Sequence, residues 1–116
     1  MPLAIKREAW LFVRDDGTCP FEDWMDSLED RTVQARVAVR VRQMEEGLFG
    51  DAKFLRDGVY EARIHFGAGW RIYYGLEGRN FIILLIGGAK SSQRHDIERA
   101  KSYWREYEST KAKRAR

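Results

Sequence analysis

The sequence has few of the residues that form disulfides in small secreted proteins or bind a structural metal. Its 116 residues include one cysteine, Cys19, together with two histidines and two prolines. A lone cysteine forms no internal disulfide, and a structural zinc site needs several cysteine or histidine ligands. We therefore expect a fold held together by its hydrophobic core, with no metal and no cofactor.

Long hydrophobic runs are also missing. The longest apolar stretch, residues 81–86 followed by two glycines, is well short of the roughly 18 residues that indicate a transmembrane helix. Near the N-terminus Lys6, Arg7 and Glu8 interrupt the apolar residues, which argues against a secretory signal. We therefore expect a cytoplasmic protein with no membrane partner.

Charge of one sign is only in modest excess. The formal net charge is +3 and the sequence pI is about 9.2, which permits a polyanionic partner without requiring one. The length and an ordinary hydrophobic content of 44% fit one domain with one core. We place this domain at residues 1–109 and expect the basic tail, residues 110–116, to be disordered.

The first half of the chain predicts one strand and two helices. Residues 4–14 end in an aromatic and β-branched run, which is typical of a strand. Pro20 suits the first position of a helix. Asp30 suits the cap of a second helix, and Gly47 suits its end.

The second half alternates between apolar and polar residues in the manner of strands. A short strand is possible at residues 52–56, and clearer strands are predicted at 59–66, 70–74 and 81–86. The last of these is apolar at every position, which predicts a central strand covered on both faces. A final helix begins at Ser91 or Ser92. The predicted order is β-α-α-β-β-β-α, an α+β fold with helices packed on an antiparallel or mixed sheet.

The predicted hairpin at residues 59–74 concentrates unusual side chains. With a three-residue turn, Gly67-Ala68-Gly69, His65 pairs with Arg71 and Arg63 with Tyr73. Directly opposed residues share a face, so these four form one cationic and aromatic face. A turn of another length would change the register. A plain solvated face would account for the same residue types.

The chemistry of this face also suits RNA. Guanidinium groups hold phosphate and stabilise a developing negative charge. Imidazole and phenol groups transfer protons or stack on bases. RNA carries its own nucleophile, the 2′-hydroxyl, so its cleavage needs only a base, cations and an acid. RNA cleavage is therefore a hypothesis that stands beside the solvated face.

Three stretches, in this order and spacing, carry a family resemblance: "GDAK" at 50–53, "YEARIHFGAGWRIYYG" at 60–75 and "GGAKSSQRHDIERA" at 87–100. Over about residues 20–105 the chain resembles the addiction-module killer proteins, HigB-like toxins within the RelE/ParE superfamily of type II toxin–antitoxin modules. The resemblance implies a RelE/ParE-like domain that cleaves mRNA on the ribosome without a metal. It also implies a cognate antitoxin, a small helix-turn-helix protein encoded nearby, through which alone the toxin would reach operator DNA.

The resemblance further implies which residues act. The predicted catalytic residues are Arg63, His65, Arg71 and Lys90. The predicted RNA contacts are Lys53, Tyr73, Gln93 and His95. Two departures leave the general acid open among His65, His95, Tyr73 and Lys90: Glu61 stands where RelE proper has a lysine, and the tyrosine of its final helix falls near Ile97.

Other readings stay open from the sequence. The ParE branch shares the fold but poisons DNA gyrase, and a degenerate toxin would only bind the antitoxin and co-repress its operon. The second predicted helix carries several arginines that form either a solvated face or a contact with ribosomal RNA: Arg31, Arg36, Arg40 and Arg42.

Overall fold

The structure is a computed structural model that describes residues 4–114. Its elements are β1 (Glu8–Leu11), α1 (Pro20–Ser27), α2 (Arg31–Glu45), β2 (Ala52–Phe54), β3 (Tyr60–Ile64), β4 (Trp70–Glu77), β5 (Phe81–Gly88), a 3-10 turn η1 (Lys90–Ser92) and α3 (Gln93–Arg114). The α+β class is confirmed. The structure has one strand more than the predicted order. The short strand considered possible at residues 52–56 forms as β2.

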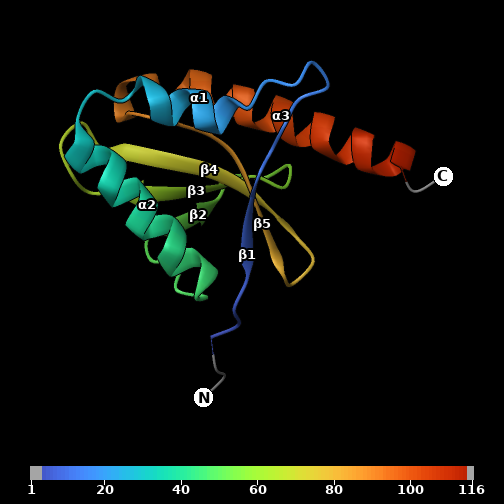
Figure 1. The fold of residues 1–116 in the computed structure, drawn as a ribbon, viewed down its shortest axis with the longest axis horizontal. Helices are drawn as coiled ribbons and strands as arrows, with labels where there is room; N and C mark the ends of the chain where they lie inside the picture. Colours follow the sequence, from blue (N-terminus) through green and yellow to red (C-terminus); the bar gives the residue numbers. More distant parts are fainter. Residues whose placement is uncertain (1–3, 115–116) are drawn as a thin grey trace.

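The strands form one mixed sheet in the order β1-β5-β4-β3-β2. β1 runs parallel to β5, and every other neighbouring pair is antiparallel. β5 lies inside the sheet, and residues 82–88 are buried. The prediction of a strand covered on both faces is therefore confirmed, because α1 and α2 pack on one face and α3 on the other (Figure 1).

The first core layer lies between α2 and the sheet. Val33, Val37 and Met44 project from α2 toward Ala62 and Ile72 of the β3–β4 hairpin. The predicted ends of the helix are confirmed. The Asp30 side chain accepts a hydrogen bond from the Thr32 N–H at 2.8 Å, and Gly47 takes a φ of +84° just past the last turn.

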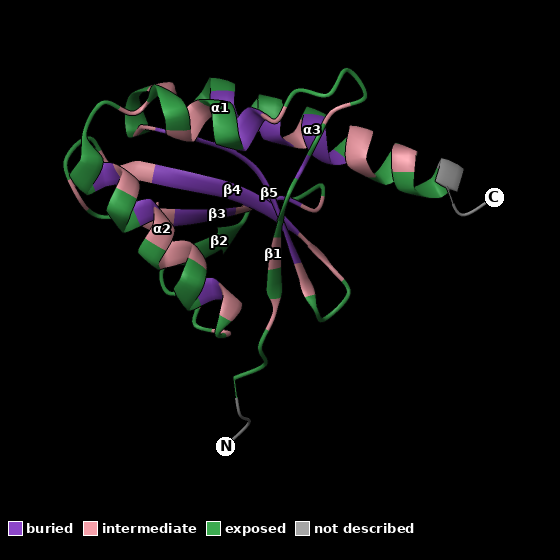
Figure 2. Cartoon of the chain, viewed as in Figure 1, coloured by how far each residue is buried: buried purple, intermediate pink, exposed green. Residues whose placement is uncertain are grey.

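The second core layer lies under α3, on the face that carries the predicted cationic patch. Ala100, Tyr103 and Trp104 of α3 pack there against Tyr73 and neighbouring residues of β4 and β5. Trp104 needs the bare backbone of Gly75, where an added Cβ would lie 2.2 Å from the indole Cζ3. Most of this face is therefore buried, as the purple strands of Figure 2 show, and a plain solvated face is excluded.

The C-terminal helix is longer than expected. α3 continues to Arg114, so residues 110–114 of the predicted disordered tail are helical, and residues 115–116 lie outside the described residues. Tyr107 and Lys111 both contact Glu77 at the end of β4, which holds this part of the helix against the sheet. Within residues 4–114, no helix is long and apolar enough to cross a membrane.

The first core layer can be tested with two apolar residues near the end of α2. Met44 is 0% exposed, whereas Leu48 is 60% exposed. Met44→Ala should lower the free energy of unfolding by about 2–5 kcal/mol, because it removes buried methylene groups and leaves a cavity. Leu48→Ala should change it by less than about 0.5 kcal/mol. Urea unfolding of both variants measures the difference, and equal losses would contradict this core assignment.

Candidate functional site

The β3–β4 hairpin closes with a five-residue loop, residues 65–69, and not with the predicted three-residue turn. Arg63 pairs with Arg71 and Glu61 with Tyr73, so the predicted pairing of His65 with Arg71 is wrong. The loop turns back on itself instead of extending the ladder, since the Phe66 N–H bonds to the Ile64 carbonyl oxygen. The true register differs by two residues, an even number, and therefore leaves Arg63, Arg71 and Tyr73 on the predicted face.

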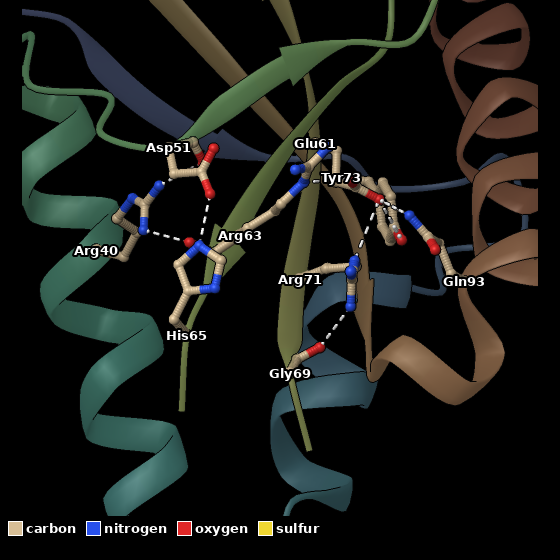
Figure 3. A network of polar contacts seen from close by, with 9 residues as sticks. All are labelled: Arg40, Asp51, Glu61, Arg63, His65, Gly69, Arg71, Tyr73 and Gln93. Carbon is tan, nitrogen blue, oxygen red and sulfur yellow. Dashed lines mark hydrogen bonds and ion pairs between the residues drawn. The ribbon is translucent and has the colours of Figure 1, made fainter. Parts of the chain in front are cut away.

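A buried carboxylate organises this face. Glu61 has no exposed surface, and its Oε1 accepts a hydrogen bond from Arg63 Nε at 3.0 Å. Its Oε2 accepts hydrogen bonds from the Tyr73 hydroxyl at 3.1 Å and from Gln93 Nε2 at 2.9 Å. Arg71 Nε lies 3.4 Å from Oε2, an ion pair without hydrogen-bond geometry (Figure 3). Three elements, β3, β4 and α3, thus meet at one side chain.

This network corrects the prediction that Tyr73 contacts RNA. The Tyr73 side chain is fully buried, so it offers no surface for stacking on a base. Burial and the neighbouring Glu61 raise the pKa of Tyr73 far above its ordinary value, so the phenol stays a neutral donor to Glu61. Gln93 is half-buried, and its amide donates to the same carboxylate.

A cavity of about 480 Å³ opens where the hairpin loop meets η1. It is lined by all four predicted catalytic residues, Arg63, His65, Arg71 and Lys90, together with the aromatic rings of Phe66 and Trp70. Lys90 reaches the cavity because its backbone N–H donates to the Ala68 carbonyl oxygen of the loop at 3.3 Å. The structure therefore brings together residues that lie up to 27 positions apart in the sequence.

His65 is paired with a carboxylate at the mouth of this cavity. Its Nε2 lies 2.6 Å from Asp51 Oδ2, and its side chain is 75% exposed. The hydrogen bond with His65 holds the pKa of Asp51 below its ordinary value. Contact with a carboxylate oxygen makes Nε2 the donor, so Nδ1 is the nitrogen left to accept a proton. An imidazole oriented in this way is suited to be a general base.

Two arginines of α2 contact the backbone and loop residues around the cavity. Arg40 donates to the carbonyl oxygens of Phe49, Asp51 and Arg63, at 3.1, 2.8 and 2.7 Å, and so connects α2 to the loop before β2 and to β3. Arg36 lies over the Phe66 ring, 4.0 Å from its centroid. Arg40 is therefore a structural residue, a role that the sequence analysis did not propose for it.

None of the four predicted RNA contacts lines the cavity: Tyr73 and Gln93 bond to Glu61, and Lys53 and His95 lie elsewhere on the surface. Lys53 is exposed on the edge strand β2, opposite Glu61 in the ladder. His95 is exposed on α3 and does not line the cavity. The sequence reasoning missed Asp51 and Arg40 as parts of the site. Asp51 lies within the "GDAK" stretch of the family resemblance, whereas nothing in the sequence marks Arg40 apart from the other arginines of its helix.

The arrangement supplies cations and a proton acceptor in one place. Within the described part of the chain, no three His, Cys, Asp or Glu side chains are grouped closely enough to hold a metal ion. Arg63, Arg71 and Lys90 offer donors for an anion, and the Asp51–His65 pair offers an imidazole nitrogen. Such a site can bind a phosphodiester and move a proton beside it.

Comparison with known proteins identifies a family but no activity. The chain is 38% identical over 84 residues to an uncharacterized protein of Haemophilus influenzae, an alignment that covers 72% of this chain and 85% of the relative. The chain belongs to the same family as that protein. No family model matches the chain, and no solved structure matches it. The function must therefore be argued from the site.

The Asp51–His65 pair can be tested by titration. In the folded protein the pKa of Asp51 is lowered, chiefly by the bond with His65. The pair therefore stabilises the fold above the unfolded pKa of Asp51, and this contribution is lost as the pH falls through the lower folded pKa. His65→Ala should raise the Asp51 pKa, whereas His95→Ala should not. Carboxyl NMR titration measures both, and an unshifted Asp51 in His65→Ala would rule out the pair.

Proposed function

We propose that this protein is the toxin of a type II toxin–antitoxin module, a HigB-like member of the RelE/ParE superfamily that cleaves mRNA on the ribosome. The observation that carries the proposal is the convergence of Arg63, His65, Arg71 and Lys90 on one cavity. The family resemblance of the three sequence stretches supplies the reaction. The proposed substrate implies a cytoplasmic protein, because translated mRNA is found in the cytoplasm.

The two arginines are suited to hold the scissile phosphate. Both contact Glu61 through Nε, and Arg71 also donates from Nη1 to the Gly69 carbonyl oxygen at 2.8 Å. Terminal guanidinium nitrogens therefore remain for phosphate oxygens. Charge-assisted bonds of this kind strengthen as negative charge develops on the phosphorane.

The remaining two residues are suited to move the protons. His65, oriented by Asp51, takes the proton of the 2′-hydroxyl, and the 2′-oxygen then forms a bond to phosphorus. The bond between phosphorus and the 5′-oxygen breaks. The ammonium group of Lys90 gives its proton to the departing 5′-oxygen. The products are a 2′,3′-cyclic phosphate and a 5′-hydroxyl.

A neighbouring groove supports neutralisation by an antitoxin. The groove, of about 680 Å³, lies between α2 and β3 and is lined in part by Arg36, Val39 and Arg40. It shares Arg63 and His65 with the proposed site. A segment of the helix-turn-helix antitoxin that folds into this groove would cover the cations. The toxin would then reach operator DNA only through the antitoxin.

Expression of the protein without its antitoxin tests the proposed activity. Growth should stop, and primer extension should detect new mRNA ends that lack a 5′-phosphate. Growth arrest with intact mRNA and broken DNA would replace the proposal with a gyrase poison. Normal growth combined with tight antitoxin binding would instead favour a co-repressor without catalysis.

Arg71 provides a sharper test of the site. Arg71→Ala should lower the cleavage rate about 10²–10³-fold, equivalent to about 2.7–4 kcal/mol, because it removes a charge-assisted contact to the phosphorane. Arg79→Ala, which removes an exposed arginine from the β4–β5 turn, should leave the rate unchanged. Antitoxin binding checks that both variants are folded. Full toxicity of Arg71→Ala would refute its assignment.

A further inference from the structure

We infer that Glu61 is a positioning residue, which holds Arg63 and Arg71 by their Nε edges and so orients their terminal nitrogens for a bound phosphate. The inference rests on the proposed function of the same cavity. It assigns a role to the one buried acidic residue that contacts both arginines in the described part of the chain.

A carboxylate at this position needs an explanation. Glu61 is 0% exposed, and burial of an unpaired charge is costly. Val59, two residues earlier on the same side of the chain, packs in the core under α3. An apolar residue at position 61 would extend this core at no electrostatic cost. The carboxylate is therefore explained by its partners and not by packing.

The geometry divides the carboxylate between the two arginines. Arg63 Nε bonds to Oε1 at 3.0 Å, and Arg71 Nε lies 3.4 Å from Oε2. Arg63 and Arg71 are directly opposed in the antiparallel ladder, where two like charges repel. Glu61 offsets this repulsion, because each guanidinium group contacts a different oxygen of the carboxylate (Figure 3). Both arginines line the cavity.

The carboxylate is itself held from two other elements. The Tyr73 hydroxyl of β4 and the Gln93 amide of α3 both donate to Oε2. These neutral donors fix the orientation of Glu61, and Glu61 in turn fixes the arginines. The start of α3 is thus connected to the phosphate-binding groups through one side chain.

A positioning role predicts that removal of the Glu61 charge slows cleavage without weakening RNA binding. The negative charge of Glu61 opposes an incoming phosphate, so its removal should not weaken RNA binding and should favour it. The loss of orientation should nevertheless slow cleavage, because a displacement of about 1 Å in a catalytic group costs about 10²-fold. A residue that only supports the fold would lower both quantities together.

The decisive variant is Glu61→Gln, which keeps the shape of the side chain and removes its charge. Single-turnover cleavage of ribosome-bound mRNA should slow about 10²-fold. The Kd for an oligoribonucleotide with one 2′-deoxy residue at the cleavage position should stay the same or decrease. Asp96→Asn is the matched control, because Asp96 is also buried at the sheet–α3 junction but bonds to Ser92. It should leave both quantities near those of the wild type.

Every result bears on the inference. Cleavage by Glu61→Gln at the wild-type rate would overturn it. If Glu61→Gln fails to fold, Glu61→Asp keeps the charge on a side chain that is one methylene shorter. It should bind RNA as the wild type does and cleave it slowly, and wild-type cleavage would again overturn the inference.

The inference can fail separately from the proposed function. If the wild-type protein neither binds nor cleaves RNA, the proposed function fails. The Nε–H NMR signals of Arg63 and Arg71 still test the positioning. The Nε protons should exchange slowly with water in the wild type and in Asp96→Asn. They should exchange rapidly in Glu61→Gln, or in Glu61→Asp if Glu61→Gln does not fold. Unchanged signals in that variant would show that Glu61 does not hold the arginines.

Discussion

The buried carboxylate of Glu61 is the interaction on which this end of the molecule depends. Its desolvation is offset by contacts with Arg63, Arg71, Tyr73 and Gln93. These partners come from β3, β4 and α3, so the carboxylate is satisfied only when the hairpin and the last helix have both docked. The position of the site is therefore coupled to completion of the fold.

The two faces of one hairpin have different roles. On one face Ala62 and Ile72 belong to the apolar core beneath α2. On the other face, Tyr73 belongs to a second core beneath α3. Arg63 and Arg71 lie at the edge of this core, next to the hairpin loop. A site built on paired strands between two packed helices is rigid, which favours precise placement of charged groups.

The groups around the cavity differ in how firmly they are held, and this difference matches their proposed roles. Arg71 is buried, its Nε is ion-paired with Glu61 and its Nη1 donates to the Gly69 carbonyl oxygen, as suits a group that must meet a phosphate at a fixed place. His65 is largely exposed and is oriented by Asp51, as suits a group that exchanges protons with water between turnovers. Lys90 is exposed on η1 and is held through its backbone by the hairpin loop.

The sequence by itself determined the α+β class, the ends of α2, the covered strand β5 and the shared face of Arg63, Arg71 and Tyr73. Periodicity and capping are local, so neighbouring residues carry them. The hairpin register, the depth at which Glu61 and Tyr73 lie, and the pairing of Asp51 with His65 were decided only by the tertiary structure. The alternating pattern of a strand is the same whether its polar residues face water or are covered by a helix. Glu61 is buried against two arginines only because α3 docks on this face of the sheet. Burial of this kind depends on residues that lie far away in the sequence.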